Sequence, residues 1–343
     1  MSATIYEVAR AAGVSTATVS RALNGSGQVA ERTRLRVTEA IAALGYQPNN
    51  VARSLVLKAT HTIAVLLPDI TNPFFPALVK GVQLAADEEG YAVLLGHTGG
   101  DPAKEESYFQ VLRGQQVDGV LLVGLISAPE SLKGLTGHGL PVVTLDRPVN
   151  VPGSATVRVD HKAGGRIATE HLLELGHRRI AHISGPKGLS VSQQRLDGYK
   201  RALSTHGVSF DDRLVAEGDF SEDGGYRGIQ ELLRTRTRFT ALFAANDLSA
   251  IGAMTALREH GMNVPDEVSV VGFDDIHVAS YTSPKLTTVR QPIYDMGRAA
   301  AKLLIDAREK RVSLKDNTTI FDAELVVRES TRRLSSRSRS TSK

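Results

Sequence analysis

The first 24 residues contain the pattern that most restricts how this chain can fold. In the stretch 5–24, IYEVARAAGVSTATVSRALN, apolar residues recur every three to four positions on both sides of Gly13. This spacing predicts two short amphipathic helices joined by a tight turn, which is a helix-turn-helix. Thr4 with Glu7 can form a capping box for the first helix, and Ser15 can cap the second. In such a unit the second helix lies in the DNA major groove, although a solvated helical hairpin has the same pattern.

A third helix is predicted over residues 31–44, followed by Gly45. Its apolar side chains share one face and would close a small core over the first two helices: Val37, Ala40, Ile41 and Leu44. Arg32, Arg34 and Arg36 lie where they could meet phosphates, or where they could simply face solvent. We therefore expect an all-α headpiece over residues 1–47.

Residues 48–60 are expected to form a hinge. The stretch 48–55, PNNVARSL, has helical spacing but is too short to hold a helix alone in water. Two copies that meet over a DNA minor groove would stabilise it, and Leu55 could then wedge between base steps. A linker that never becomes ordered is the alternative at this point.

The composition fits a protein that binds a polyanion with one end. The 343 residues contain no cysteine and no long apolar run, which predicts a cytoplasmic protein without disulfides, thiolate metal sites or a membrane span. Net charge is +4, and residues 1–60 also carry a net +4, while residues 61–327 are net acidic. No zinc-binding H-E-x-x-H, P-loop or G-x-S-x-G motif occurs, so we expect neither catalysis nor a metal or other cofactor.

From residue 60 onward, short apolar runs alternate with helical segments. The predicted strands are 62–67, 91–95, 119–123, 141–145, 180–184, 241–244 and 268–273, and the predicted helices include 74–89, 163–175, 195–206, 225–234 and 249–260. Such alternation predicts a doubly wound α/β body with buried parallel strands, over residues 61–330. A second βα series starts near Asp160, so we expect two lobes with a cleft between them. Lobe 1 would hold about 61–160 and 291–320, and lobe 2 about 161–290 and 321–330.

Polar and aromatic residues follow the predicted strands, at the end of the sheet where ligands bind in α/β folds. The predicted ligand-binding residues are Asn72, Phe74, Phe75, Asp146, Arg147, Arg195, Phe220, Asn246, Asp274 and Gln291. Carboxylates, amides and guanidinium groups can hydrogen-bond hydroxyls, and rings can cover C–H surfaces, so the set suits a sugar. The two Asp balance the two Arg, which favours a neutral ligand over a phosphate. Each residue also has a structural alternative: a helix cap for Asn246 or Asp274, a hinge salt bridge for Asp146 with Arg147, and a core position for the rings.

Six motifs resemble those of the lactose/galactose repressor family of bacterial transcription factors. They are TIYEVA at 4–9, GVSxxTVSR at 13–21, GYQPN at 45–49, VGFDD at 271–275, LTTV at 286–289 and REST at 328–331. The resemblance covers nearly the whole chain. The body is most similar to the ribose branch, because ribose-binding proteins carry an Asn with two Phe, an Asp-Arg pair, an Arg, a Phe, an Asn, an Asp and a Gln at corresponding places.

The resemblance implies a sugar-released repressor that binds a near-palindromic operator as a homodimer. The body would be a two-lobed domain similar to periplasmic sugar-binding proteins, and the effector would be D-ribose, with a hexose, a nucleoside or a purine corepressor as alternatives. DNA contacts are expected from Thr4, Tyr6, Ser15, Thr16, Ala17, Thr18, Ser20, Arg21 and Asn24 in the headpiece, and from Asn49, Ala52, Arg53 and Leu55 in the hinge.

Some positions depart from the family pattern. Ala30 stands where many members have a Ser cap, so the third helix is expected to fray. Thr16-Ala17 lacks the bulky polar pair of the lactose repressor, and Val56 replaces a small or basic residue. The Ser/Arg-rich tail, residues 331–343, has no leucine heptads, so we expect it to be disordered and the protein to form dimers.

Overall fold

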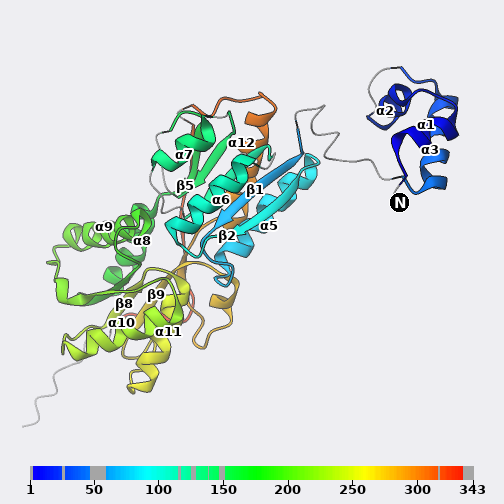
Figure 1. Ribbon diagram of the computed structural model, residues 1–343. Coiled ribbons are helices and arrows are strands. Elements are labelled where there is room, and N and C mark those ends of the chain that lie inside the picture. Colours follow the sequence, from blue (N-terminus) through cyan, green and yellow to red (C-terminus); the bar gives the residue numbers. More distant parts are fainter. Residues whose placement is uncertain are drawn as a thin grey trace, which may run out of the picture. The chain divides into compact units, whose positions relative to one another are not determined.

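The computed structural model describes residues 3–24, 28–46, 59–114, 117–124, 129–137, 139–146, 151–315 and 317–334. Internal contacts divide the chain into two units, Met1–Thr60 and His61–Lys343. We call them the headpiece and the body, and each is considered by itself (Figure 1).

The headpiece contains three helices whose starts follow from local capping. They are α1 (Ile5–Ala12), α2 (Thr16–Asn24) and α3 (Glu31–Leu44). The predicted capping box is present: the Thr4 amide donates to the Glu7 carboxylate at 2.7 Å, and the Glu7 amide donates to the Thr4 hydroxyl at 3.4 Å. The Thr18 amide donates to the Ser15 hydroxyl at 3.2 Å, which confirms the second cap. Ala30 precedes α3 without a side-chain cap, as expected.

A small apolar core holds the three helices together. Its buried members are Val8, Ala9, Ala12, Val19, Val37 and Ala40. The prediction that Leu44 joins this core is wrong, because its side chain is 40% exposed. Leu44 lies in the last turn of α3, and Gly45 then takes a left-handed conformation with φ of 59°. That turn lets Tyr46 pack against the core instead.

The body is built on two six-stranded sheets. The first has the order β11 (Thr318–Phe321), β5 (Ser154–Val159), β4 (Val142–Leu145), β3 (Gly119–Val123), β1 (Thr62–Leu67), β2 (Ala92–His97), with all neighbours parallel. The second has the order β12 (Glu324–Val326), β10 (Thr287–Arg290), β9 (Ser269–Asp274), β8 (Ala241–Ala244), β6 (Ile180–Ser184), β7 (Val215–Glu217). In it only the β10–β12 pair is antiparallel. Lobe 1 and lobe 2 denote the parts built on these two sheets.

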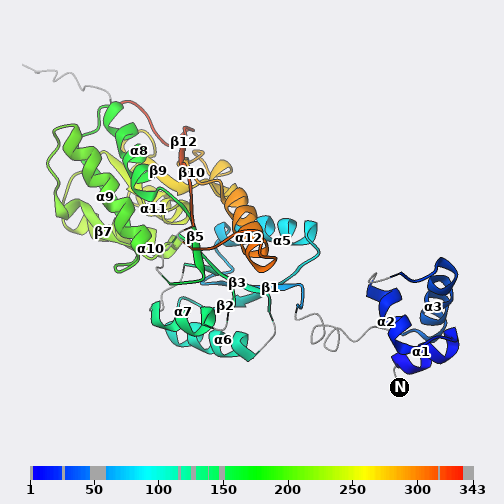
Figure 2. The ribbon, with the colours of Figure 1, turned by 90° about the horizontal axis from the view of Figure 1, so that it is seen from above.

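Helices cover both faces of each sheet, which confirms the doubly wound α/β fold (Figure 2). In lobe 1, α5 (Phe74–Glu88) and α12 (Ile293–Arg308) cover one face, and α6 (Pro102–Gly114) and α7 (Pro129–Thr136) cover the other. In lobe 2, α8 (His161–Glu174) and α9 (Ser190–Thr205) lie opposite α10 (Glu222–Arg234) and α11 (Asp247–Glu259). Two short 3₁₀ helices, η1 (Asp212–Leu214) and η2 (His277–Ser280), complete lobe 2.

The predicted strands are present with ends shifted by at most two residues, but some expectations about them are wrong. β2 was expected to be buried; Leu94 is 47% and Leu95 56% exposed because β2 is the edge of its sheet. Helix α9 begins at Ser190, five residues before its predicted start, so Arg195 lies inside the helix and not at its head. The first turn of α9 was not predicted because its sequence, SVSQQ, is mostly polar and lacks the apolar spacing of a helix.

The chain passes between the lobes at three places. These connections follow β5, β10 and β11, near Asp160, Gln291 and Asp322. Asp160 ends the first passage by accepting a hydrogen bond from the Ala163 amide at 2.9 Å, which caps α8. Among the helices in the described ranges, none is both long and apolar enough to cross a membrane.

One core histidine makes a testable contribution to stability. His182 on β6 is fully buried between the rings of Tyr199 and Phe243, and its Nδ1 lies 2.8 Å from the Phe243 carbonyl oxygen. Burial lowers the pKa of His182 to about 4, so the folded protein holds it neutral. The pKa of His182 is lower in the folded protein than in the unfolded chain, where it is 6.5. The free energy of unfolding is therefore highest above pH 6.5 and decreases as the pH falls from 6.5 toward 4, because only the unfolded chain takes up the proton.

We therefore expect wild type to lose about 2 kcal/mol from this residue between pH 7 and pH 5. His182→Phe keeps the stacked ring and should remove that loss. Urea unfolding followed by circular dichroism at both pH values measures the difference, and other titrating groups cancel because both proteins share them. Equal pH dependence in the two proteins would contradict the prediction.

Candidate functional site

The predicted DNA-contacting side chains of the headpiece lie mainly on its surface. Tyr6 is 72% exposed, and Thr4, Ser15, Ala17 and Arg21 are also exposed. Thr16, Thr18 and Ser20 are half-buried, while Val19 between them is fully buried and anchors α2 to the core. The Arg21 Nε donates to the Ala17 carbonyl at 3.2 Å, so this guanidinium is bent back along the helix.

Several predicted contact residues cannot be placed. The hinge residues Asn49, Ala52, Arg53 and Leu55, with Val56, lie outside the described ranges, as do Arg147, the tail beyond Leu334 and the side chain of Asn24. Their roles stay predictions from sequence. The expectation of a disordered tail is wrong for residues 331–334, because the Arg332 amide donates to the Ser269 hydroxyl at 3.0 Å and the Leu334 amide to the Leu175 carbonyl at 2.8 Å.

In the body, the predicted ligand residues follow the carboxyl ends of strands from both sheets. Asn72 comes after β1, Asp146 directly after β4, Phe220 after β7, Asn246 after β8, Asp274 at the end of β9 and Gln291 after β10. Arg195 reaches the same region from the second turn of α9. Asn72, Asp146, Arg195, Asn246, Asp274 and Gln291 are each 9% exposed or less.

Three of these residues have left-handed backbone conformations. The φ angle is 63° at Asp146, 66° at Phe220 and 110° at Asp274. Such conformations are unfavourable for residues with a Cβ and concentrate at functional sites. Each of the three lies at or beyond the end of a strand. There, the left-handed backbone of the residue sets the direction in which its own side chain points.

Five polar side chains form a continuous chain of contacts that we call the carboxyl-end cluster: Asp146, His161, Arg195, Asp274 and Gln291. His161 Nε2 lies 2.9 Å from Asp146 Oδ1, and Arg195 Nε lies 3.4 Å from His161 Nδ1. Arg195 Nη2 lies 3.5 Å from Asp274 Oδ1, to which Gln291 Nε2 donates at 2.7 Å. The cluster joins lobe 1, through Asp146, to lobe 2 and to the Gln291 passage.

The guanidinium of Arg195 is held between aromatic rings and backbone. Its central carbon lies 3.8 Å from the centre of the Phe273 ring and 5.7 Å from that of Phe220. Nη1 donates to the Ala245 carbonyl. Such contacts stabilise a buried cation and fix the direction of its remaining donors.

Close packing of α8 on α9 brings Arg195 to this position. A Cβ at Gly165 would lie 2.3 Å from the Arg195 carbonyl oxygen, and a Cβ at Gly198 would lie 2.2 Å from the Lys162 carbonyl oxygen. Both positions therefore require glycine, because the two helix backbones approach closely there.

The protonation of the cluster follows from burial and charge. Burial raises the pKa of Asp274 to about 6, although Arg195 opposes the shift. Burial and Arg195 lower the pKa of His161, which is therefore neutral at pH 7. Burial opposes ionisation of Asp146, but contact with His161 and Arg195 keeps its pKa below the usual value. Two carboxylates around one guanidinium disfavour an anionic ligand and favour neutral hydroxyls.

The other predicted ligand residues have mixed positions. Asn246 caps α11, accepting from the Ser249 amide at 3.0 Å, and donates to the Phe220 carbonyl at 2.8 Å. Asn72 accepts from the Phe74 amide at 3.0 Å. Phe74 is buried in the core of lobe 1, which includes Leu248 and Ile276 of lobe 2, and Phe75 packs against it. The structural alternatives considered for Asn246 and Phe74 are thus realised, and sugar contact by them remains a prediction.

Three further buried polar residues of lobe 2 were not among the predicted ligand residues: His161 in the cluster, Asp247 and Ser192. His161 was missed because the strand that it follows by two residues, β5, was not predicted. Asp247 accepts from the Thr288 hydroxyl at 2.5 Å and the Ile276 amide at 2.9 Å, and burial with nearby Asp274 raises its pKa well above the usual value. The Ser192 hydroxyl and Gln291 Oε1 are buried without a hydrogen-bond partner among the described residues. Unsatisfied groups of this kind are available to a ligand or to water.

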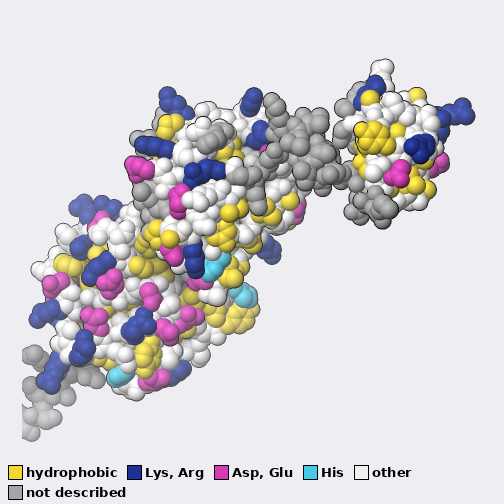
Figure 3. Space-filling view, in the orientation of Figure 1, with side chains coloured by type: hydrophobic (Ala, Val, Ile, Leu, Met, Phe, Trp, Pro, Cys, Tyr) yellow, Lys and Arg dark blue, Asp and Glu magenta, His cyan; other side chains and the backbone are white. Residues whose placement is uncertain are grey.

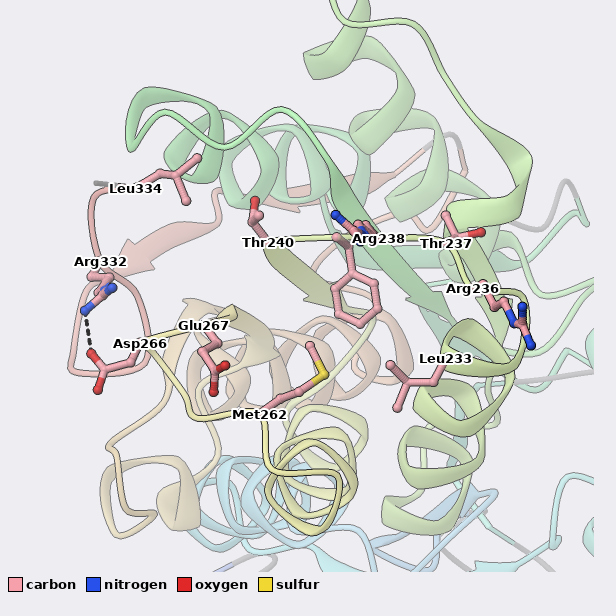
Figure 4. A pocket seen from close by; sticks show the side chains of 11 residues that line it. Leu233, Arg236, Thr237, Arg238, Thr240, Met262, Asp266, Glu267, Arg332 and Leu334 are labelled. Atoms are coloured by element: carbon pink, nitrogen blue, oxygen red, sulfur yellow. Dashed lines mark hydrogen bonds and ion pairs between the residues drawn. The ribbon is translucent and has the colours of Figure 1, made fainter. Parts of the chain in front are cut away.

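A separate hollow of about 610 Å³ lies beyond the amino end of β8. Figure 4 shows Met262 and Leu233 pointing into it, with Arg332 paired to Asp266 at one side. None of the predicted ligand residues lines it. The predicted ligand residues therefore lie at the carboxyl ends of the strands and not around this hollow.

Comparison with known proteins decides the family. Residues 4–49 match the bacterial regulatory proteins of the lacI family, and residues 169–331 match a periplasmic binding protein-like domain. A ribose operon repressor from Halalkalibacterium halodurans is 41% identical over 96% of this chain and 97% of its own length. The chain belongs to the LacI family of bacterial regulatory proteins. The regulator CelR from Thermobifida fusca is also 41% identical, over 95% of this chain and 98% of its length.

Solved structures of LacI-family proteins have the same architecture. A lac repressor dimer bound to operator and an anti-inducer gives a TM-score of 0.87 at 28% identity, covering 97% of this chain and all of that one. A CelR–cellobiose complex gives 0.74 at 38% identity, covering 96% of this chain and 99% of that one. A LacI-family regulator from Enterococcus faecium with bound ribose gives 0.73 at 32% identity, covering 80% of this chain and all of that one.

These matches confirm the expected family, fold and class of function. The chain is a DNA-binding transcriptional regulator of the LacI family, and the relatives it matches are regulators, not enzymes.

Proposed function

We propose that this repressor responds to D-ribose, binds a near-palindromic operator as a homodimer, and leaves the operator when the sugar binds. The carboxyl-end cluster is the observation that carries the proposal. It joins two carboxylates, one guanidinium and one amide from both lobes in one chain of contacts, with His161 between Asp146 and Arg195. That set hydrogen-bonds a neutral polyol and repels an anion.

The comparisons support ribose. A relative 41% identical is described as a ribose operon repressor, and a regulator 32% identical was solved with bound ribose. Cellobiose is the second candidate, since a CelR–cellobiose complex is 38% identical over nearly the whole chain. A purine would need a larger stacking surface, and the chain has no Trp.

The proposed mechanism is a shift between two populations. A sugar that contacts Asp146 of lobe 1 and Arg195 or Asp274 of lobe 2 favours the arrangement in which the lobes are close. In the dimer that arrangement would separate the hinge segments, 48–60, and weaken the hold of the headpieces on DNA. Moving the operator-bound fraction from nearly all to nearly none requires about 5.5 kcal/mol of differential sugar affinity.

Exposed apolar side chains on lobe 1 support the homodimer. Leu94 and Leu95 on the edge strand β2 are 47% and 56% exposed, and Leu84 on α5 is 38% exposed. Figure 3 shows hydrophobic side chains over β2 and α5 on the face in view. A second copy that covered this edge would bury apolar surface and satisfy an unpaired strand edge. The related lac repressor structure is described as a dimer on its operator.

Each headpiece would read one half of the operator. The exposed Ser15, Ala17 and Tyr6 can face base edges or sugar-phosphate, and Arg21 can meet a phosphate by leaving the Ala17 carbonyl. A repressor of this kind works in the cytoplasm, where the chromosome is.

A titration of the full-length protein tests the proposal. Near-palindromic sites are first selected from random duplex DNA, and binding is then measured by fluorescence anisotropy at fixed salt, because operator affinity falls steeply with ionic strength. D-ribose, cellobiose, a nucleoside and a free purine are compared. We expect ribose alone to weaken operator binding, by 100-fold or more.

Release by cellobiose alone would replace ribose as the effector and keep the repressor mechanism. Tighter operator binding in the presence of a purine would make the ligand a corepressor. If ribose leaves operator affinity unchanged, the proposed effector is wrong.

A further inference from the structure

His161 lies at the first passage between the lobes, and its two ring nitrogens face different lobes. It is fully buried in the first turn of α8, directly after the capping residue Asp160. Its Nε2 lies 2.9 Å from Asp146 Oδ1 of lobe 1. Its Nδ1 lies 3.4 Å from Nε and 3.3 Å from Nη2 of Arg195, in lobe 2.

The chemistry of the neighbours fixes the tautomer. An arginine side chain can only donate hydrogen bonds, so Nδ1 must accept. The proton of the neutral ring is then on Nε2, where it faces the Asp146 carboxylate, which can only accept. One neutral imidazole thus offers an acceptor to lobe 2 and a donor to lobe 1.

The ring is fully buried beside Phe273 and is surrounded by charged groups from both lobes. The Phe273 ring lies 6.0 Å from it, and a Cβ at the next glycine, Gly164, would lie 2.6 Å from the same ring. The charged groups that act on His161 are Asp146 directly after β4, Arg195 in α9 and Arg158 in β5, and Asp274 contacts Arg195. A second proton on the ring would set a donor against the Arg195 guanidinium.

The contact with Asp146 is short but incompletely aligned. Nε2 has no well-directed hydrogen bond among the described residues, although the carboxylate oxygen is 2.9 Å away. The same oxygen also accepts from the Val159 amide at 3.3 Å. Because Asp146 and His161 belong to different lobes, a change in the angle between the lobes would change the alignment of this contact.

We propose that His161 is a positioning residue of the effector site: its neutral ring links the Asp146 carboxylate of lobe 1 to the Arg195 guanidinium of lobe 2 and holds both in the orientation that binds sugar. The inference rests on the proposed function of the carboxyl-end cluster and adds a residue that touches the ligand-binding groups from behind. Its polar link strengthens as the lobes close on the sugar.

Two substitutions separate the polar link from the space the ring fills. His161→Gln supplies one donor and one acceptor without a titrating ring, and His161→Phe fills the space without either. His260→Gln is the matched control, because His260 is an exposed histidine at the end of α11. Circular dichroism and thermal unfolding show that each variant is folded.

Calorimetry of the full-length proteins with D-ribose gives the first readout. We expect wild type and His260→Gln to bind equally, His161→Gln to bind within about threefold, and His161→Phe to bind at least 30-fold more weakly. Wild-type affinity in folded His161→Phe overturns the proposal. So does a folded His161→Gln that binds as weakly as His161→Phe, because the polar link would then not be the cause.

Nitrogen-15 NMR of the free protein gives a second readout that needs no sugar. The imidazole signal absent from His161→Gln identifies His161, and we expect an Nε2–H tautomer that stays neutral from pH 8 to pH 6. An Nδ1–H tautomer, or a charged ring at pH 7, overturns the proposal. If wild type takes up no ribose but the tautomer is as expected, the proposed effector fails while the link through His161 is supported.

Discussion

Replacing Asp274 with asparagine is expected to leave operator binding intact and to weaken sugar binding by roughly 100-fold. The carboxylate accepts from Gln291 Nε2 at 2.7 Å and faces Arg195 Nη2 at 3.5 Å, so both neighbours aim it at one place. Asparagine has one acceptor oxygen and no charge. Losing two charge-assisted hydrogen bonds to sugar hydroxyls costs about 3 kcal/mol, which corresponds to roughly 100-fold in affinity.

The pH dependence of this site has a defined sign. Burial raises the pKa of Asp274 to about 6, so the accepting, ionised form dominates only above that pH. Wild-type sugar affinity should therefore fall as pH drops from 7 to 5, and Asp274→Asn should remove that part of the fall. Calorimetry across this range, with anisotropy for operator binding, measures both effects.

Asp266→Asn is the matched control for this substitution. Asp266 is an exposed carboxylate that pairs with Arg332 beside the hollow in lobe 2 and touches none of the cluster residues. We expect it to bind sugar as wild type does. Undiminished sugar release by Asp274→Asn would show that the carboxyl-end cluster is not the effector site.

Gly165→Ala is expected to destabilise the body by about 3 kcal/mol and to weaken sugar binding as well. The added methyl group would lie 2.3 Å from the Arg195 carbonyl oxygen and 3.0 Å from the Arg195 Cα, so α9 must move away from α8. The atoms in the way belong to the backbone, which cannot move aside as the end of a flexible side chain can. Overpacking of this kind lowers the free energy of unfolding by roughly 1–3 kcal/mol. The shift also moves Arg195 away from Asp274.

Gly134→Ala in α7 is the control for the effect of a methyl group in a helix. A Cβ there would meet the end of the flexible Arg113 side chain at 3.2 Å, and alanine favours the helix by roughly 1 kcal/mol. Urea unfolding should find Gly134→Ala as stable as wild type or more so. Comparable stabilities for the two variants would show that the close approach of α8 and α9 is not a constraint.

Local features of the headpiece could be predicted because their causes are local. The Thr4–Glu7 capping box and the Ser15 cap join residues three positions apart, and a spacing of this kind is visible in any sequence. Leu44 was misplaced because its spacing matches the core face, while the left-handed Gly45 that follows gives the position to Tyr46. The spacing of apolar residues does not show at which residue the helix ends and the chain turns.

In the body, the strands with continuous apolar runs could be predicted, and five others, among them the interior strands β5 and β10, could not. Buried parallel strands are apolar on both faces, whereas β5, β7, β10, β11 and β12 are short or mix polar with apolar residues. The edge strand β2 has an apolar sequence but exposed leucines, because sequence does not show which strand lacks a neighbour.

The sequence by itself determined the three-helix headpiece, the two α/β lobes and which strand ends carry the polar residues proposed to bind sugar. These depend on periodicity, capping and the rule that parallel strands end together. Only the tertiary structure decided that His161 joins Asp146 to Arg195, that Arg195 rests on Phe273, and that α8 packs on α9 through glycine. Those contacts join residues far apart in the chain, and their geometry is fixed by the packing of whole elements, which no local pattern encodes.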